Sequence, residues 1–238
     1  MSARLFLAPE QFEFGQARLN TAQWHYLTRV LRLRSGAECI ILDGCGKIWQ
    51  AVLANEAVTL TAELPPPATE WTVQVRIACA VPKGERWEWL LQKATELGAS
   101  EIIPLKTARS VVLPQTSKLE RWQAIVREAA EQSERLVLPR VHPPLDFEAF
   151  LQQHPAGLGF ICTARGERPS LWKCLAGMRT DAIVTLLSGP EGGFTPEEVA
   201  QAQTYSFRPV SLGSRILRAE TAPLLALGWI GAWLEAIV

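Results

Sequence analysis

The sequence has few of the residues from which metal sites and disulfide frameworks are built. It contains three histidines, which lie far apart along the chain, and five cysteines, an odd number without a C-x-x-C pair. This pattern predicts neither a zinc site nor a set of disulfides, so we expect no metal. Free cysteines are typical of a reducing compartment, and we expect the protein to be cytoplasmic.

Long hydrophobic segments and an N-terminal secretory signal are also absent. The most apolar segment, residues 222–234, lies between Glu220 and Glu235 and is too short to span a bilayer. The N-terminus lacks the basic stretch and apolar core of a signal peptide. We therefore expect no association with a membrane.

Net charge is the third feature that the chain lacks, since 24 Lys+Arg balance 24 Asp+Glu among its 238 residues. With 48% hydrophobic residues, such a chain does not stay disordered, and its length fits one or two domains. The charge is uneven, because residues 1–36 are net basic and residues 37–70 net acidic. An RNA-binding surface and a solvated surface of salt bridges both remain possible from charge alone.

Three consecutive prolines at residues 65–67 predict a boundary between two domains, residues 1–67 and 68–238. The first domain reads mainly as strands with one helix, which predicts a small barrel-like β module. We expect strands at residues 3–7, 38–42, 48–53 and 57–64, and a helix at residues 21–32.

The second domain alternates strands and helices, which predicts a mostly parallel α/β sheet covered on both faces. We expect strands at residues 71–81, 102–105, 158–162, 183–187 and 209–212. The expected helices cover residues 85–97, 119–133, 196–204 and 222–237.

Two loops after predicted strands carry unusual residues, at the sheet edge where parallel folds bind ligands. Residues 188–194 contain three glycines and a proline, followed by Thr195 as the predicted N-cap of a helix, with Glu198 completing a capping box. An ordinary strand-to-helix turn needs neither the double glycine nor the carboxylate between glycines.

The second loop, residues 213–221, places Arg215, Arg218 and Glu220 before an apolar helix. A ligand site and a solvated loop whose charges pair with each other explain it equally well. Signatures of other enzyme classes are missing, because the sequence contains no G-x-G-x-x-G opening a helix, no P-loop and no G-x-S-x-G elbow.

These motifs resemble those of the RsmE-type ribosomal RNA methyltransferases. Gly-Pro-Glu-Gly-Gly-Phe at residues 189–194 and Leu-Gly-Ser-Arg-Ile-Leu-Arg-Ala-Glu-Thr-Ala at residues 212–222 are similar to the two knot-loop motifs of that family. Further matches are His25, residues 30–32, Gly36, Lys83-Gly84, residues 92–98 and residues 128–133. Trp87 and Ala219 depart from the commoner residues of the family without removing a charge or a glycine.

The resemblance implies a PUA-like β-barrel RNA-binding domain followed by a SPOUT-type parallel sheet with a C-terminal trefoil knot. It also implies a homodimer that binds S-adenosyl-L-methionine and methylates N3 of a uridine in 16S rRNA, within the 30S subunit. Alternatives are a non-catalytic RNA-binding module, a SPOUT methyltransferase acting on another RNA, and a nucleotide-dependent small-molecule enzyme.

On this interpretation, the two loops and one residue after the strand at 158–162 bind the cofactor through backbone groups and apolar side chains. The residues expected there are Thr163, Leu187, Ser188, Gly189, Glu191, Gly192, Gly193, Leu212, Gly213, Ile216, Leu217 and Thr221.

N3 of uridine must lose its proton to become a nucleophile, and a nearby cation stabilises the resulting charge. We expect Arg218 to do this as a catalytic residue, with Glu220 orienting it or helping to remove the proton. His25 is expected to pack or hydrogen-bond within the barrel. The C-terminal helix fits either a core helix or a subunit interface. RNA phosphates are expected to contact Arg4, Arg29, Arg32, Lys83, Arg86 and Arg109.

Overall fold

The computed structural model describes residues 3–153, 157–176 and 183–237, which form two compact units. The first unit contains the chain before Trp71 together with Ala130–Leu138, and the second contains Trp71–Ala129 and the chain from Pro139 onward. The three prolines precede the change of unit, but the boundaries of independently folding domains remain a prediction. Within the described residues, no helix combines the length and apolarity needed to cross a membrane.

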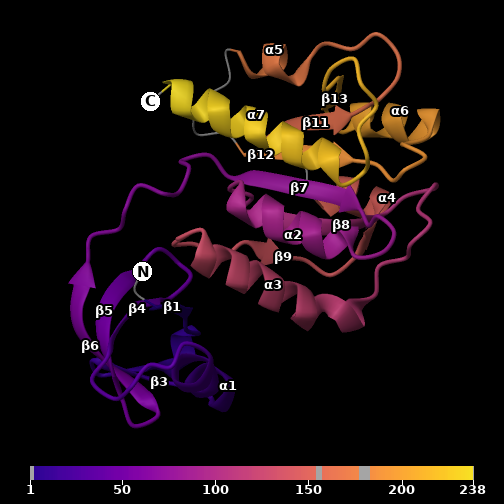
Figure 1. Ribbon diagram of the computed structural model, residues 1–238. Helices are drawn as coiled ribbons and strands as arrows, with labels where there is room; N and C mark the ends of the chain where they lie inside the picture. Colours follow the sequence, from indigo (N-terminus) through magenta and orange to yellow (C-terminus); the bar gives the residue numbers. More distant parts are fainter. Residues whose placement is uncertain (1–2, 154–156, 177–182, 238) are drawn as a thin grey trace. The chain divides into compact units, whose positions relative to one another are not determined.

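The first unit is built on one six-stranded sheet with the order β1-β4-β5-β6-β3-β2, drawn in indigo and purple in Figure 1. Its neighbouring strands are antiparallel except for β1 and β4, which are parallel. The strands are β1 (Ala3–Phe6), β2 (Phe12–Glu13), β3 (Gln16–Arg18), β4 (Glu38–Leu42), β5 (Ile48–Ala54) and β6 (Ala57–Leu64). The four predicted strands are confirmed, whereas β2 and β3 are too short to show a periodic pattern.

The predicted helix near the start is confirmed as α1 (Thr21–His25), continued by the π-helical turn η2 (Tyr26–Val30). A short 3₁₀ turn, η1 (Pro9–Gln11), precedes it. The Asn20 side chain accepts a hydrogen bond from the Gln23 N–H and caps α1. His25 is exposed, so the expectation that it packs within the barrel is wrong: only Leu27 of η2 is fully buried, and His25 lies on the opposite side of the turn.

The second unit is a seven-stranded parallel sheet with the order β10-β8-β7-β12-β11-β13, and β9 pairs with β8. This confirms the predicted α/β sheet. Its strands are β7 (Val75–Ala80), β8 (Glu101–Lys106), β9 (Arg140–Val141), β10 (Leu145–Asp146), β11 (Leu158–Cys162), β12 (Val184–Ser188) and β13 (Phe207–Val210).

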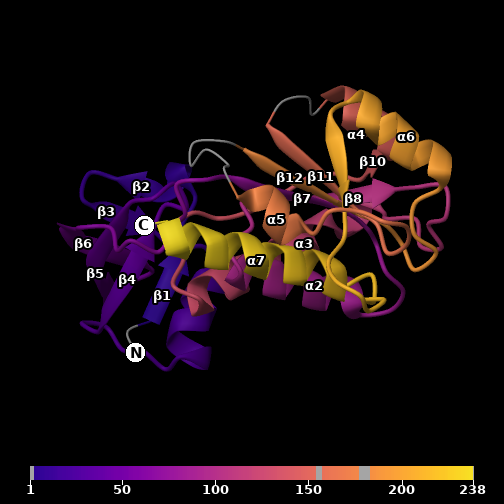
Figure 2. The ribbon, with the colours of Figure 1, turned by 90° about the horizontal axis from the view of Figure 1, so that it is seen from above.

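Helices cover both faces of this sheet, as Figure 2 shows. One apolar core packs under α2, α3, α5 and α7, and the other packs under α4 and α6. The helices are α2 (Arg86–Glu96), α3 (Leu119–Gln132), α4 (Phe147–Gln153), α5 (Leu171–Leu175), α6 (Pro196–Thr204) and α7 (Thr221–Ile237). A turn of 3₁₀ helix, η3 (Thr116–Lys118), leads into α3.

The strand predicted at residues 71–81 begins only at Val75, and Trp71 explains the difference. Its ring lies against the backbone of two glycines, where an added Cβ would come within 2.8 Å of it at Gly98 and 2.7 Å at Gly231. Trp71 therefore packs in the core instead of pairing in the sheet. Gly98 also has a φ of +87° just after α2, the conformation expected of a glycine that ends a helix.

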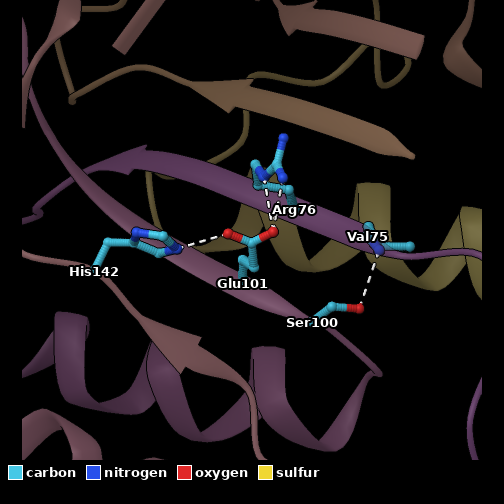
Figure 3. Close-up of polar contacts among 5 residues, drawn as sticks. All are labelled: Val75, Arg76, Ser100, Glu101 and His142. Atoms are coloured by element: carbon cyan, nitrogen blue, oxygen red, sulfur yellow. Dashed lines mark hydrogen bonds and ion pairs between the residues drawn. The ribbon is translucent and has the colours of Figure 1, made fainter. Parts of the chain in front are cut away.

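A charged cluster links three neighbouring strands at the amino ends of the sheet (Figure 3). On adjacent strands, Arg76 donates from Nε and Nη2 to Glu101 Oε1 at 3.1 and 2.7 Å. His142, which follows β9, lies with Nε2 at 2.6 Å from Glu101 Oε2. The hydrogen bond with His142 and the pairing with Arg76 outweigh burial and lower the pKa of Glu101 from 4.5 to about 2.

We expect Glu101→Gln to destabilise the protein at pH 7 by on the order of 2 kcal/mol, because it removes a charge-assisted hydrogen bond from His142 and Arg76. A depressed carboxyl pKa stabilises the fold above the ordinary value of 4.5, and this contribution is lost as pH falls toward 2. Denaturant unfolding of wild type and variant at pH 7 and pH 2.5 checks this. The exposed Glu120→Gln on α3 is the control, and a stability difference that does not shrink at low pH contradicts the assignment.

Candidate functional site

A cavity of about 1020 Å³ opens at the carboxyl ends of the central strands of the second unit. Three loops line it: residues 162–168 after β11, 188–194 after β12, and 212–222 after β13. Arg86, Arg109 and one side of α6 complete the lining. The two loops singled out from the sequence therefore face one cavity, at the edge where parallel sheets bind ligands.

The floor of the cavity is set by strand register. Cys162 is paired with Ser188 between β11 and β12, and Ser188 is paired with Cys79 between β12 and β7. Both Cys162 and Ser188 line the cavity. Burial raises the pKa of the Cys162 thiol to about 12, so this thiol is protonated at neutral pH and packs as an apolar group.

The loop after β12 needs glycine for two different reasons. A Cβ on Gly189 would lie 3.1 Å from the backbone nitrogen of Phe194 and 3.2 Å from the carbonyl carbon of Gly193. The end of the loop therefore packs directly against Gly189. Gly193 has a φ of +68°, and its N–H donates to the Pro190 carbonyl at 2.8 Å. The loop is thus a tight turn with its backbone exposed to the cavity.

Neighbouring segments hold this turn in place. Glu198, which is buried, accepts hydrogen bonds at 2.8 Å from the backbone N–H groups of Thr195 and Ala108. The Arg109 guanidinium donates to the Gly192 carbonyl at 2.8 Å, and Glu191 accepts from the Lys83 backbone at 3.2 Å. Glu191 and Arg109 therefore fix the shape of the loop.

The loop after β13 turns directly into α7. Gly213 has a φ of +113°, and the Arg218 carbonyl accepts hydrogen bonds from the backbone of Thr221 and Ala222 at the start of the helix. The Arg218 side chain is exposed and lines the cavity. Within the described residues, no carboxylate pairs with its guanidinium.

Glu220 differs from our expectation that it orients Arg218. The residue is 7% exposed, and its carboxylate lies 3.5 Å from Nε of Arg86 on α2. Its side chain turns inward from the start of α7, whereas that of Arg218 faces the solvent. The second oxygen, Oε2, is buried and has no hydrogen-bond partner within the described part of the chain. An unpartnered buried carboxylate oxygen at a cavity is a site for a donor from a ligand.

Most of the residues predicted to bind a cofactor line this cavity, and two do not. Leu187 is fully buried in the core on the α4 and α6 side of the sheet, one position before the strand end. Thr221 is the exposed first residue of α7 and lies outside the lining. The predicted cofactor and catalytic residues that line the cavity are Thr163, Ser188, Gly189, Glu191, Gly192, Gly193, Leu212, Gly213, Ile216, Leu217, Arg218 and Glu220.

The basic residues predicted to bind RNA lie in different surroundings. Arg86 and Arg109 line the cavity, while Lys83 borders a neighbouring shallow depression that Arg86 and Trp89 also line. In the first unit, Arg4 is half-buried and paired with Glu134 at 3.0 Å. Arg29 and Arg32 are exposed.

Sequence reasoning missed Arg165 and Arg168, which line the cavity from the loop after β11. Their signal was present, because both follow a predicted buried strand at its carboxyl end. The same Thr-Ala-Arg-Gly-Glu-Arg segment contains an acid, however, and is equally typical of a solvated loop.

Two family models match the chain. An RNA methyltransferase domain matches residues 69–231, and an RNA methyltransferase PUA domain matches residues 19–61. Together they cover most of both compact units.

Relatives and solved structures agree with these models. The chain is 45% identical to ribosomal RNA small subunit methyltransferase E of Synechocystis sp., over 99% of this chain and 79% of that one. It is 34% identical to the protein of the same name from Bacillus subtilis, over 90% and 88% of the two chains. The crystal structure of the Neisseria gonorrhoeae enzyme bound to S-adenosyl methionine is 30% identical, with a TM-score of 0.84 over 98% of each chain.

Proposed function

This chain belongs to the ribosomal RNA small subunit methyltransferase E family, and from that premise we propose that it methylates N3 of a uridine in 16S rRNA, with S-adenosylmethionine as the methyl donor. One observation in the structure carries the proposal. The two glycine-bearing loops, residues 188–194 and 212–222, line a single cavity beside an unpaired arginine and a buried carboxylate. Such a cavity offers backbone hydrogen-bonding groups to a ligand, an arginine that stabilises negative charge and a carboxylate that accepts a proton.

The residues present fit the donor. A cavity of about 1020 Å³ is large enough for a nucleoside with an amino-acid tail, and its glycine loops leave backbone donors and acceptors open to an adenine edge. A side chain at Gly189 would distort the turn that provides this backbone surface. Leu212, Ile216 and Leu217 supply apolar surface for the faces of the base. When bound, S-adenosylmethionine supplies an electrophilic methyl group.

Arg218 and Glu220 have separate tasks in this proposal. Loss of the N3 proton leaves negative charge on the uracil ring and its two carbonyl oxygens, and the Arg218 guanidinium stabilises that charge. Glu220 takes the proton on its free Oε2, since its other oxygen faces Arg86. Arg86 holds the Glu220 carboxylate in position and is a positioning residue.

Partner and assembly are part of the same proposal. We propose that the substrate is the 30S subunit in the cytoplasm, that the chain after β11 forms a trefoil knot, and that two copies pair through α2 and α7. The last point is supported by Trp89 on α2, which is 47% exposed, and by half-buried Leu225 and Trp229 on α7, the helix that contacts α2. Sedimentation of the purified protein measures the number of copies.

The function is tested by methyl transfer to purified 30S subunits that lack the modification. Tritiated S-adenosylmethionine should label the 16S rRNA, and mass spectrometry of the digested nucleosides should find 3-methyluridine. Label at another nucleoside rejects the assigned target, and cofactor binding without transfer to any RNA favours a non-catalytic module.

We predict that Gly189→Ala weakens binding of S-adenosylmethionine about tenfold or more, because its Cβ would press on the backbone of residues 193–194. Gly192→Ala is the matched comparison. There the added Cβ would meet only the flexible Arg109 side chain, at 3.3 Å, so a smaller loss is expected. Titration calorimetry measures both affinities, and equal losses would show that the closure at Gly189 does not shape the site.

Replacing Arg218 should separate binding from chemistry. We predict that Arg218→Ala keeps cofactor affinity within about twofold but lowers kcat about 100-fold, the usual cost of removing one charge-stabilising donor. Arg218→Lys should recover part of the rate, and the exposed Arg140→Ala on β9 should leave it unchanged. Wild-type turnover by Arg218→Ala on 30S subunits would remove this arginine from the mechanism.

A further inference from the structure

The cavity carries more positive charge than its cofactor explains. Among the described residues, six arginines line it, against two carboxylates, Glu191 and Glu220. Arg86 is engaged with Glu220, and Arg109 with the loop carbonyl of Gly192. The remaining arginines are Arg165, Arg168, Arg215 and Arg218. Because the sulfonium of S-adenosylmethionine is itself a cation, these four guanidinium groups oppose that ligand and suit an anion.

A second hollow adjoins this rim. It is a shallow groove of about 600 Å³ lined by residues 167–169, Gln203 and residues 206–209. Arg168 and Gln203 line both hollows, so the groove adjoins the cavity at these two residues. We call this hollow the β13 groove, since it runs over β13, which contacts α6 and pairs with β11. Figure 1 shows β13 and α6 beside each other at this side of the sheet.

Two cations, Arg168 and Arg208, and one exposed carboxylate, Glu167, line the β13 groove, which leaves it net positive. The Arg168 Nη1 atom donates to the Glu167 carbonyl at 3.1 Å, and its guanidinium lies over Gly166, where an added Cβ would be in ordinary van der Waals contact with it at 3.8 Å. Arg208 points outward from β13 between buried Phe207 and Val210. Neither guanidinium is within ion-pair distance of a carboxylate in the described part of the chain.

Protection of a sheet edge is the ordinary explanation for a charge and a proline on an outer strand. It accounts for Arg208 and Pro209, which lie on β13 itself. It does not account for Arg168, which lies in the loop after β11 and lines both the groove and the cavity.

We propose that the β13 groove binds backbone phosphates of the RNA strand next to the target uridine, through Arg168 and Arg208. The inference rests on the proposed function and adds the path of the substrate. A base can enter the cavity only if its own strand crosses the rim, and the neighbouring phosphates then lie where the unpaired cations are. Arg168, shared by the two hollows, contacts the phosphate nearest the target.

The test is the double variant Arg168→Gln/Arg208→Gln, with Arg127→Gln/Arg140→Gln as a matched control. The control removes the same charge from α3 and β9, outside both hollows. Binding to 30S subunits is measured at several salt concentrations, with no methyl transfer required. Loss of two phosphate contacts should make the slope of log affinity against log salt shallower by about 1.4.

Kinetics provide a second readout. The double variant should raise KM for 30S subunits roughly tenfold, with little change in kcat and unchanged affinity for S-adenosylmethionine, because phosphate contacts contribute uniform binding. If the double variant has the same salt slope and the same KM as the control variant, the β13 groove does not bind the RNA, and the proposal is wrong. A different outcome separates the two proposals. If the salt slopes of wild type and double variant differ as expected but wild type methylates no RNA, the groove binds RNA and the proposed function is wrong.

Discussion

The parallel pairing of β11 with both β12 and β13 is the constraint on which the site depends. It places Cys162, Ser188 and Val210 in neighbouring register positions, so the three loops that follow these strands leave the sheet at the same edge. Between the first and the last of these loops lie 43 residues, 169–211, and only the sheet brings the loops together. If either strand were antiparallel, the loop that follows it would leave at the opposite end of the sheet, where the Glu101 cluster lies. The carboxyl ends of the strands thus form the ligand site, and the amino ends are held together by the ion pairs that link β7, β8 and β9.

Within this arrangement, the glycine loop is held by contacts from other strands. The segments after β7 and β8 supply the Lys83 and Ala108 backbone N–H groups and the Arg109 side chain, and each binds a different part of residues 188–198. A glycine-rich turn alone would sample many conformations, because glycine loses more backbone entropy on ordering than any other residue. Three fixed contacts from neighbouring segments offset that cost and give the cavity a defined wall.

The sequence predicted the elements that have a strong local signal. Thr195, Pro196 and Glu198 identified the start of α6 because a capping box is a contact between residues three apart, and Gly98 marked the end of α2 for a similar local reason. The family motifs located both loops of the cavity. Contacts between distant residues were beyond this reasoning: the pairing of Glu220 with Arg86 and the burial of Leu187 both depend on tertiary packing. Short elements such as β9 and β10 are formed by their neighbours in the sheet and have no periodicity of their own.

The balance of charge in the sequence conceals the basic character of the site, because many carboxylates are used inside the fold. Glu70 binds Arg135, Glu101 binds Arg76 and His142, and Glu198 binds two backbone N–H groups. These acids are held in ion pairs or hydrogen bonds and project little field into solvent. The arginines around the cavity are not neutralised in the same way, since Arg165, Arg168, Arg215 and Arg218 lack carboxylate partners within the described residues. A chain with no net charge therefore has a positive rim around the cavity at which all three loops meet.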